Sequence, residues 1–179
     1  MKNIIKVSVL REQLLSKTSG INKEPGIYRW WFKEDIAKSL ISKLPITSDE
    51  IDKIQKQVID GEKYWALYLG ISKDMLARAK WHVTQKDSIS AIKRGFISTL
   101  RQTISALLDE DMSKSTGCIN QLMDDNCYWE WEYDQSPENR ESAELSSKNV
   151  CYPLNIKKNK TVKKDVIKCL MSLRKKHRK

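Results

Sequence analysis

The chain has 179 residues, 40% of them hydrophobic, so its length and composition suit one domain with an ordinary core. No apolar run approaches the roughly 20 residues that a membrane-spanning helix needs, and we expect no membrane partner. The four cysteines form no Cys-x-x-Cys pair and there are two histidines, which argues against a zinc site and is typical of free thiols in a reducing compartment. We therefore expect a soluble cytoplasmic protein.

The net charge of +10 is concentrated at the C-terminal end of the chain. Residues 156–179 contain eleven Lys or Arg and one Asp, whereas basic and acidic residues balance in the part that precedes them. Such a segment is attracted to polyphosphate, to an anionic membrane or to an acidic protein, and its binding to nucleic acid would depend on salt. The alternative is a terminus that only keeps the protein in solution.

The first third of the chain is predicted to hold an aromatic strand between short helices. Pro25 and Gly26 begin the strand, in which Tyr28, Trp30 and Phe32 alternate with residues of the opposite face. The predicted elements are an extended lead-in, a helix, the aromatic strand and two further helices, at residues 3–9, 10–17, 26–32, 34–44 and 47–58. We interpret residues 34–61 as a helical insertion between two strands that would otherwise form a hairpin.

A second strand, residues 64–70, leads into a helix that carries charged and titratable groups. Its side chains alternate up to Gly70, which suits a strand exit because glycine can adopt conformations that other residues avoid. Ser72 is the expected N-cap of the helix. Asp74, Arg78 and His82 follow at intervals of four residues, so we expect them to share the exposed edge of that helix.

The apolar period of residues 88–109 predicts one long helix, with Arg101 on its exposed face. The remaining predicted elements are a polar loop, a strand at a sheet edge, a helix begun by proline, an amphipathic helix and a disordered end, at residues 109–126, 127–134, 136–148, 162–173 and 174–179. The expected fold is α/β, an α+β sandwich in which a small three-stranded, mainly antiparallel sheet is flanked by helices. We expect residues 1–155 to form the main domain and residues 156–179 a basic helix and tail.

Five elements of this sequence resemble the GIY-YIG nuclease superfamily. Gly26-Ile27-Tyr28 and Tyr68-Leu69-Gly70 resemble its two naming motifs, and the insertion explains why the two tyrosines are 40 positions apart. Arg78 follows the second motif by eight residues, as an arginine does in the family, and His82 follows one turn later. Glu144 on a later helix, with Pro153 and Asn155 after it, completes the pattern. The resemblance spans residues 26–155.

The resemblance implies a divalent-metal-dependent endonuclease that hydrolyses DNA phosphodiester bonds. Glu144 would hold Mg²⁺ or Mn²⁺, Arg78 the phosphate, and Tyr68 would be the general base. Tyr28 would orient water, and His82 is a second candidate base or a phosphate donor. The expected nucleic-acid contacts are Lys80, Arg101, Asn155, Lys157 and Lys158.

Several alternatives stay open at this point. Glu141 competes with Glu144 as the metal ligand, and RNA competes with DNA as the substrate. A nuclease with one active centre must either form a homodimer or act twice to cut both strands. Each side chain also has an ordinary structural explanation when it is considered alone. The alternative function is a catalytically inactive module of the same fold that binds nucleic acid or protein.

Overall fold

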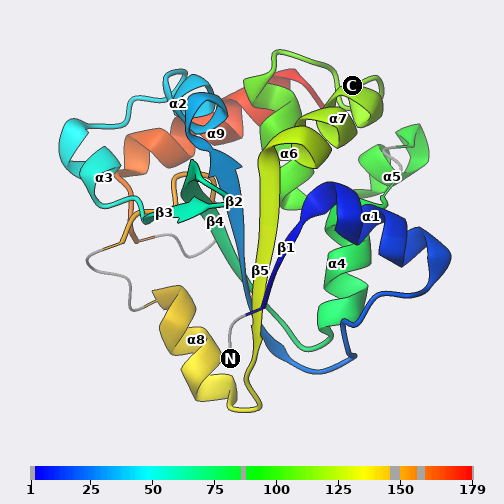
Figure 1. The fold of residues 1–179 in the computed structure, drawn as a ribbon. Coiled ribbons are helices and arrows are strands. Elements are labelled where there is room, and N and C mark those ends of the chain that lie inside the picture. Colours follow the sequence, from blue (N-terminus) through cyan, green and yellow to red (C-terminus); the bar gives the residue numbers. More distant parts are fainter. Residues whose placement is uncertain (1–2, 86–87, 146–149, 157–159, 179) are drawn as a thin grey trace.

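The computed structural model describes residues 3–85, 88–145, 150–156 and 160–178, apart from the side chains of residues 143–145. Within these residues the elements, in chain order, are β1 (Asn3–Lys6), α1 (Val7–Ser16), β2 (Gly26–Lys33), α2 (Glu34–Ile41), α3 (Ser48–Asp52), β3 (Lys56–Ile59), β4 (Glu62–Ser72), α4 (Met75–Val83), α5 (Ile89–Arg94), α6 (Thr99–Leu107), α7 (Thr116–Asn126), β5 (Cys127–Tyr133), α8 (Pro137–Leu145) and α9 (Lys164–Lys176). Figure 1 shows a curled sheet surrounded by helices, so the predicted α/β class is confirmed.

The sheet has five strands among the described residues, in the order β1-β5-β2-β4-β3, and all neighbouring strands are antiparallel. The three predicted strands form its centre, but the predicted count of three is wrong because β1 and β3 add an edge on each side. The prediction that β5 lies at an edge is also wrong. Glu130 of β5 is buried, and two contacts compensate its charge there. Arg29 Nη1 lies 2.6 Å from Glu130 Oε1, and the indole N–H of Trp31 donates to Oε2 at 2.9 Å.

The predicted helical insertion contains a strand as well as two helices. The second helix, α3, ends at Asp52, and β3 then pairs with the start of β4. Asp60 and Gly61 join the two strands with φ values of 50° and 82°, as a two-residue turn between twisted strands requires. The insertion therefore ends in a hairpin that extends the sheet.

The segment predicted as one helix over residues 88–109 is divided in two. Gly95 ends α5 in the left-handed conformation, with φ of 73°, and Ser98 caps α6 by accepting a hydrogen bond from the backbone N–H of Arg101 at 3.3 Å. Glycine at a helix C-cap and serine at an N-cap are common at helix ends. Here they divide the segment into two helices although its apolar period is continuous. The polar stretch that follows, predicted as a loop, forms α7 instead.

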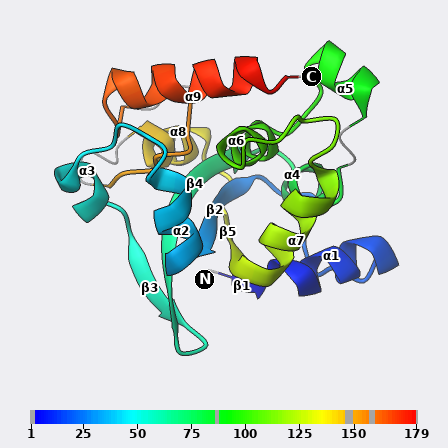
Figure 2. The same ribbon diagram turned by 90° about the horizontal axis from the view of Figure 1, so that it is seen from above.

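Two other helix ends differ from the sequence prediction. Asp74, and not Ser72, caps α4, since its carboxylate accepts from the N–H of Ala77 at 2.8 Å. α9 continues to Lys176, through residues predicted to be disordered, and its buried Val166 and Leu170 belong to the main core. Figures 1 and 2 show that α9 lies alongside α6.

The two faces of the sheet bury separate clusters. Tyr28, Trp30 and Phe32 of β2 point into the larger one, which α1, α4, α6, α7 and α9 also enter, whereas Ile27 and Trp31 point into a smaller one, as the alternation predicted. Each fully buried aromatic side chain of this kind contributes roughly 1.5–3 kcal/mol. In the part of the chain that the structure describes, no helix combines the length and the apolar character needed to cross a bilayer.

Candidate active site

A pocket of about 220 Å³ opens where β2, β4 and α4 meet the start of α6. Four residues that the sequence singled out contribute to its lining: Tyr28, Tyr68, Arg78 and Asn155. Gly70, Ile71, Thr99 and Ile156 complete it. The chain thus brings together residues from two strands, two helices and the extended segment that follows α8.

An irregularity in β4 turns Tyr68 toward this pocket. Strand β4 pairs Tyr68 with Trp30 and Ala66 with Trp31, which leaves Leu67 without a partner in the register with β2. Such a bulge shifts the alternation of side chains by one residue. Tyr68 therefore packs on the same face as Trp65 and Leu67, beside Tyr28, whereas a regular strand would have carried it to the other face. The two phenol rings lie 6.2 Å apart between centroids.

Tyr28 is enclosed on three sides and is 2% exposed. Its ring stacks on Trp129 at 4.5 Å and 9°, and a Cβ built on Gly70 would lie 2.3 Å from its hydroxyl oxygen. Only glycine at position 70 leaves room for the phenol. Gly26 is constrained in the same way, because a Cβ there would lie 2.4 Å from the carbonyl oxygen of Glu132 in β5. The glycines of both motifs thus allow close approach.

The hydroxyl of Tyr28 lies 2.9 Å from Nε2 of His82. The imidazole is 1% exposed, so the prediction of an exposed edge shared with Asp74 is wrong for this residue. Its Nδ1 lies 2.6 Å from Oγ of Ser98, and both ring nitrogens therefore have partners that make burial affordable. Burial, with Arg78 and Arg101 nearby, holds the pKa of His82 well below its ordinary value, so the ring is neutral near pH 7.

Ser98 is a site residue that the sequence analysis missed. Its backbone N–H donates to Oε1 of Gln85 at 2.7 Å, and its hydroxyl both caps α6 and contacts the imidazole. The signal that could have found it is the Gly95 to Thr99 stretch, which has the glycine and serine of a break between helices. No local pattern indicates that the hydroxyl of this cap also contacts His82.

Arg78 points into the pocket from α4 and is partly exposed. Among the described residues its guanidinium makes no hydrogen bond or ion pair, and the carboxylate of Asp74, one turn earlier, instead caps the helix. A guanidinium that lines a polar pocket without a protein partner is suited to an anion.

Asn155 lines the pocket and binds the backbone of β4 through its side-chain amide. Its side-chain oxygen accepts from the N–H of Leu69 at 3.0 Å and its side-chain nitrogen donates to the carbonyl oxygen of the same residue at 2.7 Å. The side-chain amide thus forms with the second motif the pair of backbone hydrogen bonds that a neighbouring strand would form. A contact from this amide to nucleic acid, which remains a prediction, would have to compete with those bonds.

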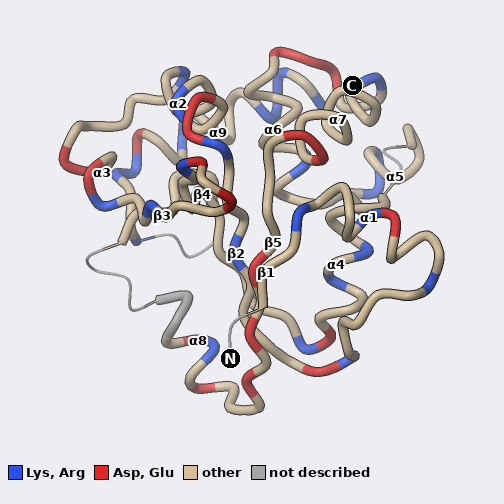
Figure 3. Tube along the Cα trace, in the orientation of Figure 1, with Lys and Arg blue, Asp and Glu red and all other residues tan. Residues whose placement is uncertain are grey.

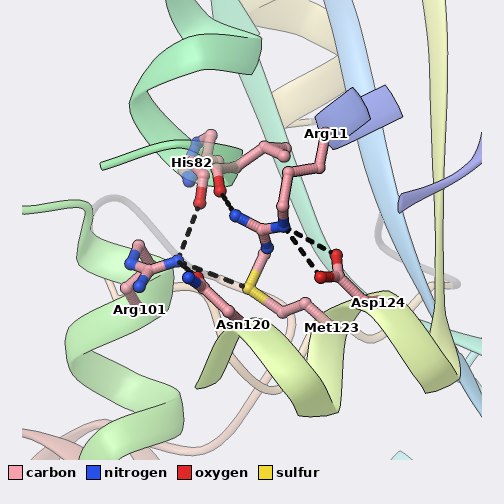
Figure 4. Close-up of polar contacts among 7 residues, drawn as sticks. Arg11, His82, Arg101, Asn120, Met123 and Asp124 are labelled. Atoms are coloured by element: carbon pink, nitrogen blue, oxygen red, sulfur yellow. Dashed lines mark hydrogen bonds and ion pairs between the residues drawn. The ribbon is translucent and has the colours of Figure 1, made fainter. Parts of the chain in front are cut away.

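Arg101 does not lie on an exposed face as predicted, but is 0% exposed in the core. Figure 4 shows its Nη1 directed at the carbonyl oxygen of His82, 3.3 Å away, and at Oδ1 of Asn120, 2.9 Å away. Arg11 donates to the next carbonyl, that of Val83, and pairs with Asp124 through Nε at 2.8 Å. Two arginines thus satisfy carbonyls that the end of α4 leaves open. In this conformation Arg101 cannot reach a nucleic acid.

The other predicted site residues either do not line the pocket or lie outside the described part of the structure. Lys80 is exposed on α4, and its contact with nucleic acid stays a prediction. Lys157 and Lys158 lie outside the described residues, as does the side chain of Glu144. Helix α8, which carries Glu144, packs against β2 and β4. The described Glu141 side chain on the same helix is exposed.

A family model of the GIY-YIG catalytic domain matches residues 26–176, most of the chain. The chain belongs to the GIY-YIG family. This confirms the resemblance drawn from the two motifs, and it extends the family region through α9. GIY-YIG proteins are nucleases that generally use divalent metals, so membership indicates a nuclease-type hydrolase with a nucleic-acid substrate. Comparisons with curated proteins and with solved structures returned no match.

Proposed function

We propose that the chain is a divalent-metal-dependent endonuclease that hydrolyses DNA phosphodiester bonds in the pocket between β2, β4 and α4. The observation that supports this most directly is the meeting of Tyr28, Tyr68 and Arg78 in one pocket, with a neutral His82 bonded to Tyr28. These groups match the needs of the reaction, which are a proton acceptor, a phosphate ligand and a place for water.

Tyr28 and His82 form the proposed general base. In the tautomer in which Nδ1–H donates to Ser98, Nε2 can accept the hydrogen bond of the Tyr28 hydroxyl. When water attacks phosphorus, its proton passes to the Tyr28 oxygen while the phenol proton passes to Nε2. A phenol alone, with a pKa of about 10, is a poor catalyst of this transfer at neutral pH. This assigns the base to Tyr28, in place of Tyr68.

Arg78 and Tyr68 would hold the substrate. The planar guanidinium of Arg78 can bind two phosphate oxygens, and its interaction strengthens as charge develops in the transition state. Tyr68, partly exposed in the pocket, would orient the attacking water or a phosphate oxygen.

The metal would be held by Glu144. No three His, Cys, Asp or Glu side chains gather into a metal-binding group in the described part of the chain. A divalent ion here would therefore be held by one carboxylate with water and phosphate oxygens, a shell that suits Mg²⁺. The pocket has polar oxygens, an uncommitted cation for the phosphate and α8 packed on both motif strands, which fits this arrangement. A bound ion would supply charge neutralisation at the phosphate and at the leaving oxygen.

Nicking of supercoiled plasmid DNA in Mg²⁺ tests the proposal. Tyr28→Phe removes the hydroxyl and keeps the ring, and we expect a loss of activity of about 100-fold or more, as is typical for general bases. Arg78→Ala should cause a loss of similar size. The matched control is Tyr128→Phe, which removes a phenol hydroxyl that binds Asp60 and whose ring packs in the cluster on the opposite face of the sheet.

Full activity in both Tyr28→Phe and Arg78→Ala would remove the proposed site. Binding of plasmid without cleavage in Mg²⁺ and in Mn²⁺ would instead support the inactive binding module. Equal losses in the control and in Tyr28→Phe would mean that the hydroxyl acts through stability alone.

A further inference from the structure

A second groove, of about 380 Å³, joins the proposed active site. Thr99 and Ile156 line both cavities, so they form the boundary between them. The opposite wall of the groove is formed by one face of α9, with Met171, Arg174 and Lys175, and by Arg178 just beyond the end of that helix. The groove therefore leads directly away from the pocket that holds Tyr28 and Arg78.

The three cations of this wall have no acidic partners. Arg174, Lys175 and Arg178 make no ion pair to any described residue, whereas two other cations of α9, Lys168 and Lys176, pair with Asp165 at 3.6 Å and Asp109 at 3.0 Å. Of the residues that the structure describes, none that lines the groove is Asp or Glu. Figure 3 shows Lys and Arg positions near the end marked C, and Figure 2 shows that this end lies beside α5. Like charges gathered without carboxylates favour an anionic ligand.

Arg174 connects this wall to the active site. Its Nη2 donates to Oε1 of Gln102, while its Nε–H is buried and meets no acceptor among the described residues. The pKa of Arg174 is lowered, mainly by burial and also by Arg178, and the nearby phenol of Tyr68 opposes this change. A guanidinium that lines the groove close to Tyr68 brings positive charge next to the phosphate proposed for the pocket.

The core and a backbone hydrogen bond hold the basic wall of the groove in place. Val166 and Leu170 bury the other face of α9 in the main core, and the backbone N–H of Met112 donates to the carbonyl oxygen of His177 at 3.0 Å. α9 ends at Lys176, so Arg178 extends the basic wall past the helix. Met171, 57% exposed, adds an apolar surface to the groove.

We propose that the groove between α6 and α9 binds the backbone of the DNA strand beside the bond to be cut, with Arg174, Lys175 and Arg178 contacting its phosphates. This rests on the function proposed above and adds a route for the substrate. The groove thus serves affinity and position, and the chemistry stays with Tyr28, His82 and Arg78.

The test compares two double variants that remove equal charge from the C-terminal part of the chain. Lys175→Ala/Arg178→Ala removes two exposed cations of the groove, and Lys168→Ala/Lys176→Ala removes two exposed cations outside it. Binding of a fluorescent DNA oligonucleotide, single-stranded and duplex, is measured by anisotropy in EDTA, where no cleavage occurs. We expect the groove variant to weaken binding about tenfold or more and to reduce the slope of log K against log salt by about 1.4–1.8, the value for two lost phosphate contacts.

Equal weakening by both double variants would overturn the groove, because it would show a general effect of charge. Unchanged binding by the groove variant would also overturn it. Competition by polyglutamate as effective as that by DNA would point to an acidic protein partner and would contradict the proposal. Circular dichroism and urea unfolding of both variants exclude misfolding as the cause.

The groove and the nuclease activity can fail independently. Hydrolysis of the small diester bis(p-nitrophenyl) phosphate requires the pocket and not the groove, so the groove variant should keep its rate on this substrate while KM for DNA rises. Loss of DNA binding in a protein that cleaves neither substrate would support the groove and remove the proposed catalysis. An equal loss of rate on both substrates would place these cations in the pocket's own function and overturn the groove.

Discussion

A Cβ atom on Gly70 would lie 2.3 Å from the hydroxyl oxygen and 2.4 Å from Cζ of Tyr28. The ring of Tyr28 cannot move away from such a Cβ atom, because Trp129 stacks on it at 4.5 Å. We predict that Gly70→Ala displaces the phenol, breaks its bond to His82 and lowers nicking activity at least about tenfold, with a stability loss of about 1–3 kcal/mol from overpacking. Gly117→Ala, in open space on α7, is the control and should be neutral or slightly stabilising. A fully active Gly70→Ala protein would contradict this packing.

The stability of the protein should fall in mild acid because of His82. The pKa of His82 in the folded protein lies well below the ordinary value of about 6.5. Below about pH 6.5 the imidazole therefore binds a proton in the unfolded chain but stays neutral in the folded one. Stability is therefore unaffected well above about pH 6.5 and decreases as the pH falls below it, by up to about 1.4 kcal/mol per pH unit. Urea unfolding of wild type and His82→Gln at about pH 7 and about pH 5 measures this.

The His82→Gln protein should show a smaller loss between the two pH values. His177 is present in both proteins, so its contribution cancels in the comparison. An identical pH dependence in the two proteins would mean that the buried imidazole is not the group that titrates.

Replacement of Arg101 should act on folding and not on direct contact with DNA. Arg101→Ala leaves a cavity and removes the donor to the carbonyl oxygen of His82 and to Asn120, so we expect a loss of about 2–4 kcal/mol in the free energy of unfolding. Arg94→Ala removes an exposed arginine of α5 and should change stability by less than about 0.5 kcal/mol. Chemical denaturation gives both values. A stable Arg101→Ala protein with weakened DNA binding would restore the role predicted from the sequence.

The two glutamates of α8 can be separated by isosteric change. We predict that Glu144→Gln abolishes metal-dependent nicking and weakens the binding of Mn²⁺, because an amide is a poorer ligand than a carboxylate for a hard cation. Glu141→Gln, on the same helix and exposed, should leave both unchanged. Isothermal titration with Mn²⁺ and the plasmid assay provide independent measurements, and the opposite pattern would transfer the ligand to Glu141.

The family and much of the site could be predicted because they depend on local sequence. The Gly26 to Tyr28 strand, the second motif and the helix that bears Arg78 all appear where their periodicities predicted them. The order of five short matches identified the family, although each side chain alone had an ordinary explanation.

Other features depend on long-range partners that a local pattern does not contain. The burial of His82 depends on Ser98, sixteen residues later, and that of Arg101 on Asn120. Glu130 looked like an exposed edge charge, yet Arg29 pairs with it across the sheet. The division of residues 88–109 was visible in Gly95 and Ser98, but the apolar period outweighed these two residues in the prediction.

Because Leu67 is unpaired in β4, the side of the sheet that Tyr68 faces is not set by counting residues along the strand. Deletion of that one residue would restore a regular pleat in which Tyr68 follows Ala66 directly and keeps the pocket face. Both phenols would then still lie on the side of the sheet opposite to the face that buries Tyr152. Two chains that differ by one residue before the second tyrosine would thus present it to the same side of the sheet when the longer one carries the bulge.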